Sequence, residues 1–325
     1  MKAVLCKEFG PVDQLVVEDV PPLSARPGAV VLSVKACGIN FPDGLIVQGK
    51  YQTKPPLPFS PGLEVAGIIK EVGEGVTDLK IGQRVIAFPG VGGLAEEVVV
   101  DSWLVFPMPE AMDYASGAGF LITYATSHHA LKVRGHLKAG ETLLVLGAAG
   151  GVGLTAVEIG KVMGARVIAA ASSDEKLALC KQYGADEVIN YTTENLRDRI
   201  KEITGGKGVD VVYDPVGGPL AEASVRSLAW MGRYLVIGFA AGDIPRIPLN
   251  LLLLKSSSLV GVYWGAALKA DPKAGRADVA ELLSWFAEGK LKPCISATYP
   301  LDKAADAIEF VAGRNAKGKV VVVMG

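Results

Sequence analysis

Cysteine and histidine are scarce in this chain of 325 residues, which has four cysteines and three histidines. The cysteines are widely separated, with no CxxC pair and no clustered set of metal ligands: Cys6, Cys37, Cys180 and Cys294. This spacing excludes a disulfide framework and a cysteine-rich zinc module. We expect reduced thiols, most of them buried. Cys37 is the candidate for a reactive thiol, because a polar cluster follows it.

Long apolar runs and an excess of charge of one sign are also missing. The longest apolar stretches, such as residues 249–254, fall far short of the roughly 20 residues that span a bilayer. Charged residues follow within the first eight positions, which leaves no room for a signal-peptide core. A formal net charge of −1 provides no global field for nucleic acid or an anionic membrane. We therefore expect a cytoplasmic protein without a membrane or nucleic-acid partner.

What is present is typical of a packed enzyme with two domains. Apolar residues make up 50% of the chain and charged residues 21%, and the length suits two ordinary domains. Up to about residue 120, short Val/Ile/Leu runs lie between Gly and Pro clusters and predict a barrel-like β domain. The predicted strands cover residues 29–36, 65–72, 84–88 and 96–100.

From near Gly117 onwards, helical and strand patterns alternate. Helices are predicted over 120–133, 154–163, 174–183 and 278–287, and apolar strands over 141–146, 166–171, 187–190, 210–213, 234–238 and 259–263. Uniformly apolar strands between helices predict a doubly wound parallel sheet covered on both faces. The last segment is predicted as a helix followed by a strand over 319–324, which we place back on the β domain.

The strongest local motif is the glycine-rich run over residues 145–153, VLGAAGGVG, between a predicted strand and a predicted helix. Glycines permit a tight turn and a close approach of the backbone to a pyrophosphate. The helix N-terminus adds unpaired N–H groups and a favourable dipole. The motif predicts a dinucleotide site with five contact residues: Ala149, Gly150, Gly151, Val152 and Gly153.

The end of the second strand indicates which dinucleotide is bound. Ser172 and Glu175 have the spacing of a capping box, which would place Asp174 in the first helical turn rather than at the ribose. Ser172, Ser173 and Lys176 then offer donors and a cation that suit a 2′-phosphate. The alternative is an ordinary helix start with a solvated lysine. We predict NADPH rather than NADH.

With the β domain, the glycine motif and the returning C-terminal strand, the whole chain resembles the medium-chain dehydrogenase/reductase superfamily. Four stretches are similar to its zinc-free quinone oxidoreductase, or zeta-crystallin-like, branch: ACGINFPD (36–43), PGLEVAG (61–67), AAGGVG (148–153) and DPVGG (214–218). The resemblance implies an α/β fold. A GroES-like catalytic β domain would cover residues 1–122 plus 292–325, and a Rossmann cofactor-binding domain residues 123–291. It also implies a homodimer formed through the cofactor domain.

The resemblance also allows an expectation about zinc. Zinc-dependent relatives carry a cysteine at the position of Asn40 and a histidine at the position of Leu63, and neither residue here is a good zinc ligand. The histidines, His128, His129 and His136, lie in or just after one helix and match no ligand position. The scattered cysteines exclude the relatives' structural zinc as well. We expect no metal.

The resemblance assigns further residues to the site. Asn40 and Tyr51 are expected in the catalytic cleft, and Asp43 is either a third catalytic group or a structural partner. Further cofactor contacts are expected at Thr123, Tyr191, Gly238, Phe239, Ala240, Val262, Tyr263, Trp264 and Asn315. Tyr263 and Trp264 could equally belong to the core or to a subunit contact.

Without zinc to polarise an oxygen, the acceptor must already be electron-poor. The sequence therefore predicts NADPH-dependent reduction of a quinone. One alternative is reduction of an enone or an enoyl thioester. A CoA ester would need a basic groove for its phosphates, and beside Tyr51 only the flanking Lys50 and Lys54 offer positive charge. The alternative from another class is an NADPH-binding structural or RNA-binding protein, which the near-neutral charge disfavours.

Overall fold

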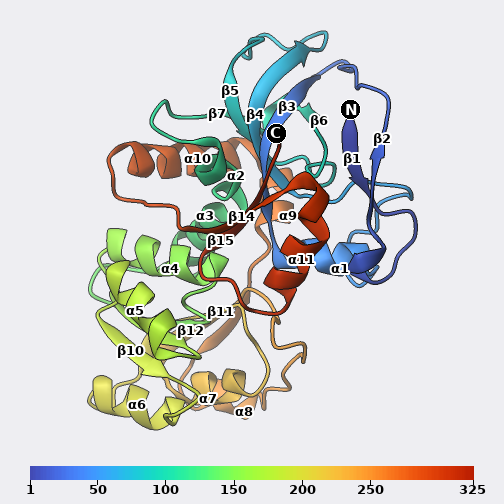
Figure 1. Ribbon diagram of the computed structural model, residues 1–325. Helices are drawn as coiled ribbons and strands as arrows, with labels where there is room; N and C mark the ends of the chain where they lie inside the picture. The colour runs from blue at the N-terminus through green and yellow to red at the C-terminus, as the bar shows by residue number, and fades with distance from the viewer. The chain divides into compact units, whose positions relative to one another are not determined.

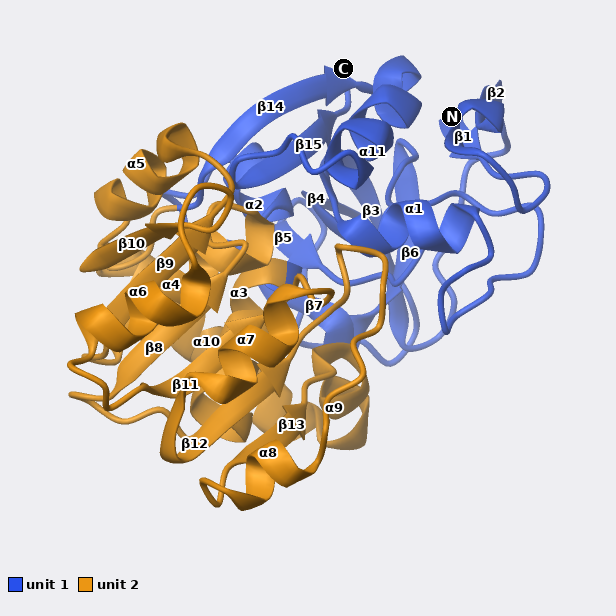
Figure 2. Cartoon of the chain, turned by 90° about the horizontal axis from the view of Figure 1, so that it is seen from below, with its two compact units in different colours: residues 1–122, 293–325 blue, residues 123–292 orange.

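The computed structural model describes residues 1–325, which divide into two compact units (Figure 2). Unit 1 consists of Met1–Ile122 together with Pro293–Gly325, and unit 2 is Thr123–Lys292. The chain therefore passes from one unit to the other twice. We call the passage from Ile122 to Thr123 the first crossing and the passage from Lys292 to Pro293 the second crossing.

Unit 1 is built around the long strand β3 (Ala29–Ile39), whose residues are almost all buried. β3 pairs antiparallel with β4 (Glu64–Val72), β6 (Glu97–Asp101) and β15 (Lys319–Val323). β5 (Arg84–Ala87), β7 (Val105–Pro107) and β14 (Ile295–Pro300) complete the sheet. β1 (Lys2–Leu5) and β2 (Val16–Asp19) form a separate pair. The pairing of β15 with β3 confirms the predicted return of the C-terminal strand.

Three helices accompany this sheet: α1 (Phe41–Val47), α2 (Tyr114–Ala118) and α11 (Ala304–Ala312). α11 packs beside α1 (Figure 1). α2 approaches β3 closely because β3 has a glycine there: a Cβ on Gly38 would lie 2.1 Å from the Ala118 carbonyl oxygen. Any larger residue at position 38 would push α2 away from the sheet.

Unit 2 contains the predicted doubly wound sheet. Its six strands run in the order β10-β9-β8-β11-β12-β13 and all pair in parallel. Their bounds are β8 (Thr142–Leu146), β9 (Arg166–Ala171), β10 (Glu187–Asn190), β11 (Val209–Asp214), β12 (Leu228–Val236) and β13 (Ser258–Gly261). The strand order reverses between β8 and β11, which is where such sheets bind ligands at their carboxyl edge.

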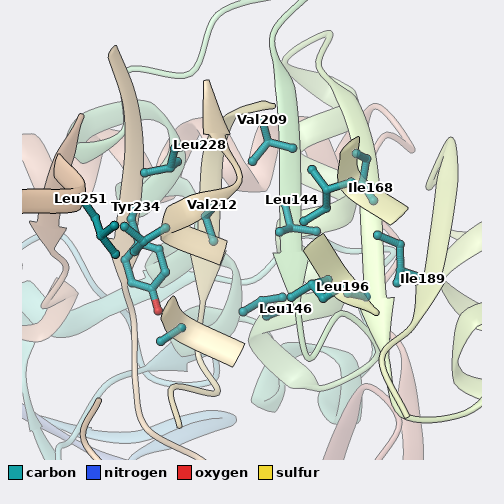
Figure 3. Packing of buried hydrophobic residues seen from close by; sticks show 14 residues of the cluster. Leu144, Leu146, Ile168, Ile189, Leu196, Val209, Val212, Leu228, Tyr234 and Leu251 are labelled. Carbon is teal, nitrogen blue, oxygen red and sulfur yellow. The ribbon is translucent and has the colours of Figure 1, made fainter. Parts of the chain in front are cut away.

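Helices cover both faces of this sheet. On one face, side chains of α6 (Leu196–Ile203), α7 (Leu220–Arg226) and α8 (Asn250–Leu253) join the strands in one buried cluster (Figure 3). On the other face lies α4 (Gly151–Val162), where a Cβ on Gly160 would come within 2.7 Å of the Leu143 side chain. The remaining helices are α3 (Leu121–His128), α5 (Asp174–Gln182), α9 (Trp264–Ala270) and α10 (Pro272–Ala287).

Several predicted boundaries shift for identifiable reasons. The helix predicted over 120–133 ends as an α-helix at His128 and continues as a π-helical turn over His129–Arg134. The helix predicted from residue 278 begins at Pro272, because the Asp271 side chain caps it by accepting from the Ala274 N–H at 3.0 Å. None of the helices in either unit has the length and apolar character that crossing a membrane requires.

Candidate functional site

The glycine-rich turn between β8 and α4 is shaped for a phosphate group. Gly147 adopts a left-handed φ of +56°, and a Cβ on Gly153 would lie 2.2 Å from the Gly147 carbonyl oxygen. Only glycine fits at position 153, because α4 passes so close to the turn. The N-cap residue, Gly150, has no side chain to satisfy the N–H groups of the first turn. Those N–H groups and the helix dipole can therefore hold an anion.

At the end of β9, Ser172, Ser173 and Lys176 come together. Ser173 is the N-cap of α5 and accepts from the Lys176 N–H at 3.4 Å, so the predicted capping box starting at Ser172 is wrong by one residue. The ammonium of Lys176 donates to the Ser172 hydroxyl at 3.4 Å. Asp174 lies in the first turn as predicted, and its carboxylate accepts from the Asn190 amide at 2.8 Å. This arrangement leaves two hydroxyls and a cation grouped at the strand end.

The loops after β11 and β12 are hydrogen-bonded to each other at the carboxyl edge of the sheet. Asp214 organises the first loop by accepting from the N–H groups of Val216 at 2.7 Å and Gly217 at 2.9 Å. The second loop joins through the Ala240 N–H, which donates to the Pro215 carbonyl at 3.0 Å. Burial raises the pKa of Asp214, and its second oxygen accepts from the Tyr234 hydroxyl.

A cavity of about 130 Å³ opens beside these two loops. Gly238 and Phe239, two of the predicted cofactor contacts, belong to its lining, together with Asp214, Tyr234 and apolar side chains from β12, β13 and residues 244–247. The cavity lies entirely within unit 2 and is largely apolar.

The other predicted cofactor residues of unit 2 follow strand ends or begin helices. Thr123 is buried in α3, and its carbonyl accepts from the Thr155 hydroxyl at 3.1 Å. Tyr191 follows β10 and is half-buried against the sheet cluster. Val262 and Tyr263 follow β13, and the Tyr263 side chain is 49% exposed. Trp264 begins α9 and is buried.

Of the predicted catalytic residues, Asn40 and Asp43 lie together at the start of α1. The two Asp43 oxygens accept from the N–H groups of Asn40 at 2.8 Å and Gly62 at 3.1 Å. Burial raises the pKa of Asp43 to about 7, although these N–H donors and Lys319 favour the charged form. Tyr51 lies ten residues after Phe41 in an irregular segment and is half-buried. Asn315 is exposed in the turn after α11.

The Asn40 side chain belongs to a buried polar network that joins three strands of unit 1. Lys319 donates to the Asn40 side-chain oxygen, to the Ile39 carbonyl and to Glu64, each at 2.7 Å. The Asn40 amide nitrogen donates to Glu64 at 3.0 Å and to the Gly38 carbonyl at 3.2 Å. Both N–H donors of this amide are therefore already used.

Glu64 and Lys319 are site residues that the sequence reasoning missed. Glu64 also accepts from the Ile122 N–H at 2.9 Å, and the exposed fractions of Glu64 and Lys319 are only 1% and 5%. In the sequence, each of them is a charged residue directly before an apolar run, VAGII after Glu64 and VVVV after Lys319. A buried charge in such a position needs a partner of opposite sign, so the two could have been paired.

The residues at the zinc positions of zinc-dependent relatives do not match a catalytic zinc site. Leu63 offers no ligand atom, and the Asn40 side chain and the Glu64 carboxylate are engaged with Lys319. Elsewhere, His128 lies beside Asp278 and Glu281, but Lys132 already pairs with Glu281 there. Cys37 is fully buried and its pKa is raised by that burial, so the expectation of a reactive thiol is wrong.

Comparison with known proteins agrees with this architecture. Residues 26–110 match the family model described as the alcohol dehydrogenase GroES-like domain, and residues 151–288 match the one described as zinc-binding dehydrogenase. The chain is 43% identical over 325 residues to the quinone oxidoreductase-like protein 2 homolog of Nematostella vectensis, covering 99% of this chain and 88% of that protein.

Two solved structures show the same fold. Quinone oxidoreductase of Escherichia coli, crystallised with NADPH, aligns with a TM-score of 0.93 at 30% identity, covering 99% of this chain and 100% of that one. The CurK enoyl reductase aligns with a TM-score of 0.91 at 26% identity, covering 100% of this chain and 99% of that one.

The raised pKa of Asp43 predicts a pH dependence of stability. The folded protein holds this proton up to about pH 7, whereas an unfolded aspartate releases it near its ordinary value. The contribution to stability is therefore full at low pH and is lost as the pH rises through about 7. Between about pH 5 and pH 7, the contribution of this group to the unfolding free energy should fall by up to about 1.4 kcal/mol for each unit by which the pH rises.

Urea unfolding across this pH range measures the slope. Asp43→Asn cannot ionise and should show a shallower slope. At pH 5 its unfolding free energy should also be lower than that of the wild type by about 1–3 kcal/mol, because an amide offers one oxygen to two buried N–H donors, and this difference should shrink as the pH rises. The exposed Asp78→Asn variant is the control and should keep the wild-type slope. Equal slopes in wild type and Asp43→Asn would show that Asp43 does not carry this linkage.

Proposed function

We propose that this chain, which belongs to the quinone oxidoreductase branch of the medium-chain dehydrogenase/reductase superfamily, reduces quinones with NADPH and without zinc. The observation that carries the proposal is the closed network of Asn40, Glu64 and Lys319, which leaves no zinc ligand set at this position of the fold. The glycine turn between β8 and α4, whose N–H groups can bind a phosphate, supports the use of a dinucleotide. An oxidoreductase with a dinucleotide but without a Lewis acid suits an acceptor that is already electron-poor.

NADPH, when bound, supplies the hydride. The glycine turn and the first turn of α4 would hold its pyrophosphate, because they combine close backbone approach with free N–H groups. Ser172, Ser173 and Lys176 would hold the 2′-phosphate. Tyr191, Thr123 and Asn315 are proposed as further contacts. At the carboxyl edge, residues 238–240 and 262–264 would border the nicotinamide.

For the acceptor, we propose that Tyr51 is the hydrogen-bond donor to the oxygen on which charge develops. Asn40 was the other candidate donor, but its two N–H groups already bind Glu64 and the Gly38 carbonyl. Its proposed contribution is therefore to hold the start of α1 in place. Asp43 supports the same turn, since both of its oxygens bind backbone N–H groups. A quinone needs little more than this, because its ring delocalises the added charge.

A second candidate function is the reduction of an enone or an enoyl thioester, in which the hydride adds at the β carbon. The likeness to the CurK enoyl reductase is the observation that favours it. A purely structural or RNA-binding role has less support, because the formal net charge is −1.

NADPH oxidation with a panel of acceptors tests the proposal. We expect the highest kcat/KM with 9,10-phenanthrenequinone or 1,4-benzoquinone, and lower values with a short enone and with crotonyl-CoA. Activity should survive removal of metals by a chelator, and metal analysis should find no stoichiometric zinc. Tyr51→Phe should lower kcat by roughly tenfold to a thousandfold if the hydroxyl stabilises the oxyanion. A clear preference for the thioester would replace quinone reduction by the second candidate.

Lys176 should determine the choice of cofactor. Replacing it by alanine removes the cation proposed for the 2′-phosphate and should lower the ratio of kcat/KM for NADPH to that for NADH by roughly tenfold to a hundredfold. Lys181, one helical turn further along α5, provides the matched control, and Lys181→Ala should leave the ratio unchanged. A wild-type preference for NADH would refute this assignment.

We also propose a homodimer formed through unit 2. β13 is one of the two edge strands of the parallel sheet, and large apolar side chains are exposed on β12 and β13: Trp230 (69%), Met231 (64%) and Leu259 (37%). Sedimentation velocity should show a dimer for the wild type and a shift towards monomer for Leu259→Arg. A wild-type monomer at micromolar concentration would contradict the proposal.

A further inference from the structure

One face of helix α4 holds both crossings between the two units. Thr155 and Glu158 are three residues apart on this helix, so their side chains share a face, and both are buried. The same helix begins at the glycine turn, with its first residue at Gly151. The crossings are the only covalent connections between the units.

The first crossing is bound at two points. The Thr155 hydroxyl donates to the Thr123 carbonyl at 3.1 Å, and the Tyr124 hydroxyl donates to one Glu158 oxygen at 2.6 Å. Tyr124 is only 1% exposed, which makes this a hydrogen bond in a dry environment. Further along α3, the Ser127 hydroxyl donates to the Val152 carbonyl in the first turn of α4 at 3.0 Å. α3 and the start of α4 are therefore fastened together.

The second crossing is bound by the other oxygen of the same carboxylate. The Lys292 N–H donates to Glu158 at 2.8 Å, directly before the chain enters unit 1. Each oxygen of Glu158 thus holds a different crossing. Burial raises the pKa of Glu158 to about 7, which shows that the surroundings disfavour its charge. What the carboxyl group adds to the packing of α4 is geometric, because an apolar side chain at this position could hydrogen-bond to neither crossing.

We propose that Glu158 is a positioning residue that couples occupancy of the glycine turn to both crossings. Binding of a dinucleotide immobilises the first turn of α4. Because the helix is rigid, Glu158, about two turns after Gly151, is immobilised with it. The relevance to catalysis rests on the proposed function, in which unit 2 holds the cofactor. Ordering the two segments that join the units would then reduce the motions that compete with hydride transfer.

Hydrogen–deuterium exchange with saturating NADPH tests the coupling without any acceptor. In the wild type, NADPH should slow deuterium uptake at least several-fold in peptides covering residues 120–126 and 290–295. Glu158→Met removes both hydrogen bonds of this carboxyl group, although NADPH still binds in a fluorescence titration. It should abolish the slowing in residues 290–295 and weaken it in residues 120–126, where the contact from Thr155 to Thr123 remains. Glu158→Gln should keep it, because the amide oxygen can accept from Lys292 and the amide nitrogen can donate to the Tyr124 hydroxyl.

Ser224→Ala is the matched control, since it removes another buried hydrogen bond of unit 2, from Ser224 to the Leu220 carbonyl, that touches neither crossing. It should retain the slowing even if its melting temperature falls. If Glu158→Met does not fold, Tyr124→Phe removes one of the two Glu158 contacts and should weaken the slowing in residues 120–126 while leaving it unchanged in residues 290–295. Persistence of the full wild-type slowing in folded Glu158→Met, or in Tyr124→Phe at residues 120–126, would overturn the proposal.

Kinetics with the best acceptor then test the positioning role. Glu158→Met should lower kcat by roughly tenfold or more and raise the isotope effect of deuterated NADPH, with its NADPH Kd within about twofold of wild type. An unchanged kcat and isotope effect would refute the catalytic part of the proposal. Because the exchange experiment uses no acceptor, inactivity of the wild type towards quinones would contradict only the proposed function.

Discussion

The contact between Lys319 and Asn40 joins residues 279 positions apart and links the two separate stretches of chain that make up unit 1. The buried ammonium of Lys319 donates to an oxygen of Ile39 on β3, of Asn40 at the N-cap of α1 and of Glu64 on β4. These contacts hold the last strand, β15, beside β3. Breaking such a pair would leave an uncompensated charge in the core, at a cost of about 3–5 kcal/mol. Because β15 comes last in the chain and pairs with β3, unit 1 is complete only after the chain has passed through unit 2 and returned, by way of the two crossings.

This arrangement also explains why the polar groups near the start of α1 are poor candidates for direct proton chemistry. Asn40 and Asp43 direct nearly all of their hydrogen-bonding capacity inwards, towards Lys319, Glu64 and backbone N–H groups. Charge neutralisation between Lys319 and Glu64 leaves no strong electrophile at this position. A site of this kind suits a reaction whose driving force lies in the acceptor.

The features that could be predicted from sequence are those encoded within a short stretch of chain. The parallel strands of unit 2, the glycine turn and the returning C-terminal strand follow from local apolar runs and glycine spacing. The cap of α5 was assigned to Ser172 rather than Ser173, since either serine could act and only the observed backbone path decides. α6 and α7 were not predicted, because both are short and one carries an almost wholly charged surface. The pairing of Glu64 with Lys319 depends on the register of distant strands, which local patterns do not contain.

The burial of the thiols has a chemical consequence for a protein that handles electrophiles. Quinones and enones alkylate thiolates, and a thiolate forms only where the pKa is low and solvent can reach the sulfur. Burial raises the pKa of Cys6, Cys37 and Cys180, and Gly62 and Gly93 enclose the Cys37 sulfur so tightly that a Cβ on either would lie within 2.9 Å of it. Only Cys294 is partly accessible. The packing that buries three of the four thiols thus also protects them from alkylation by the acceptors proposed for this chain.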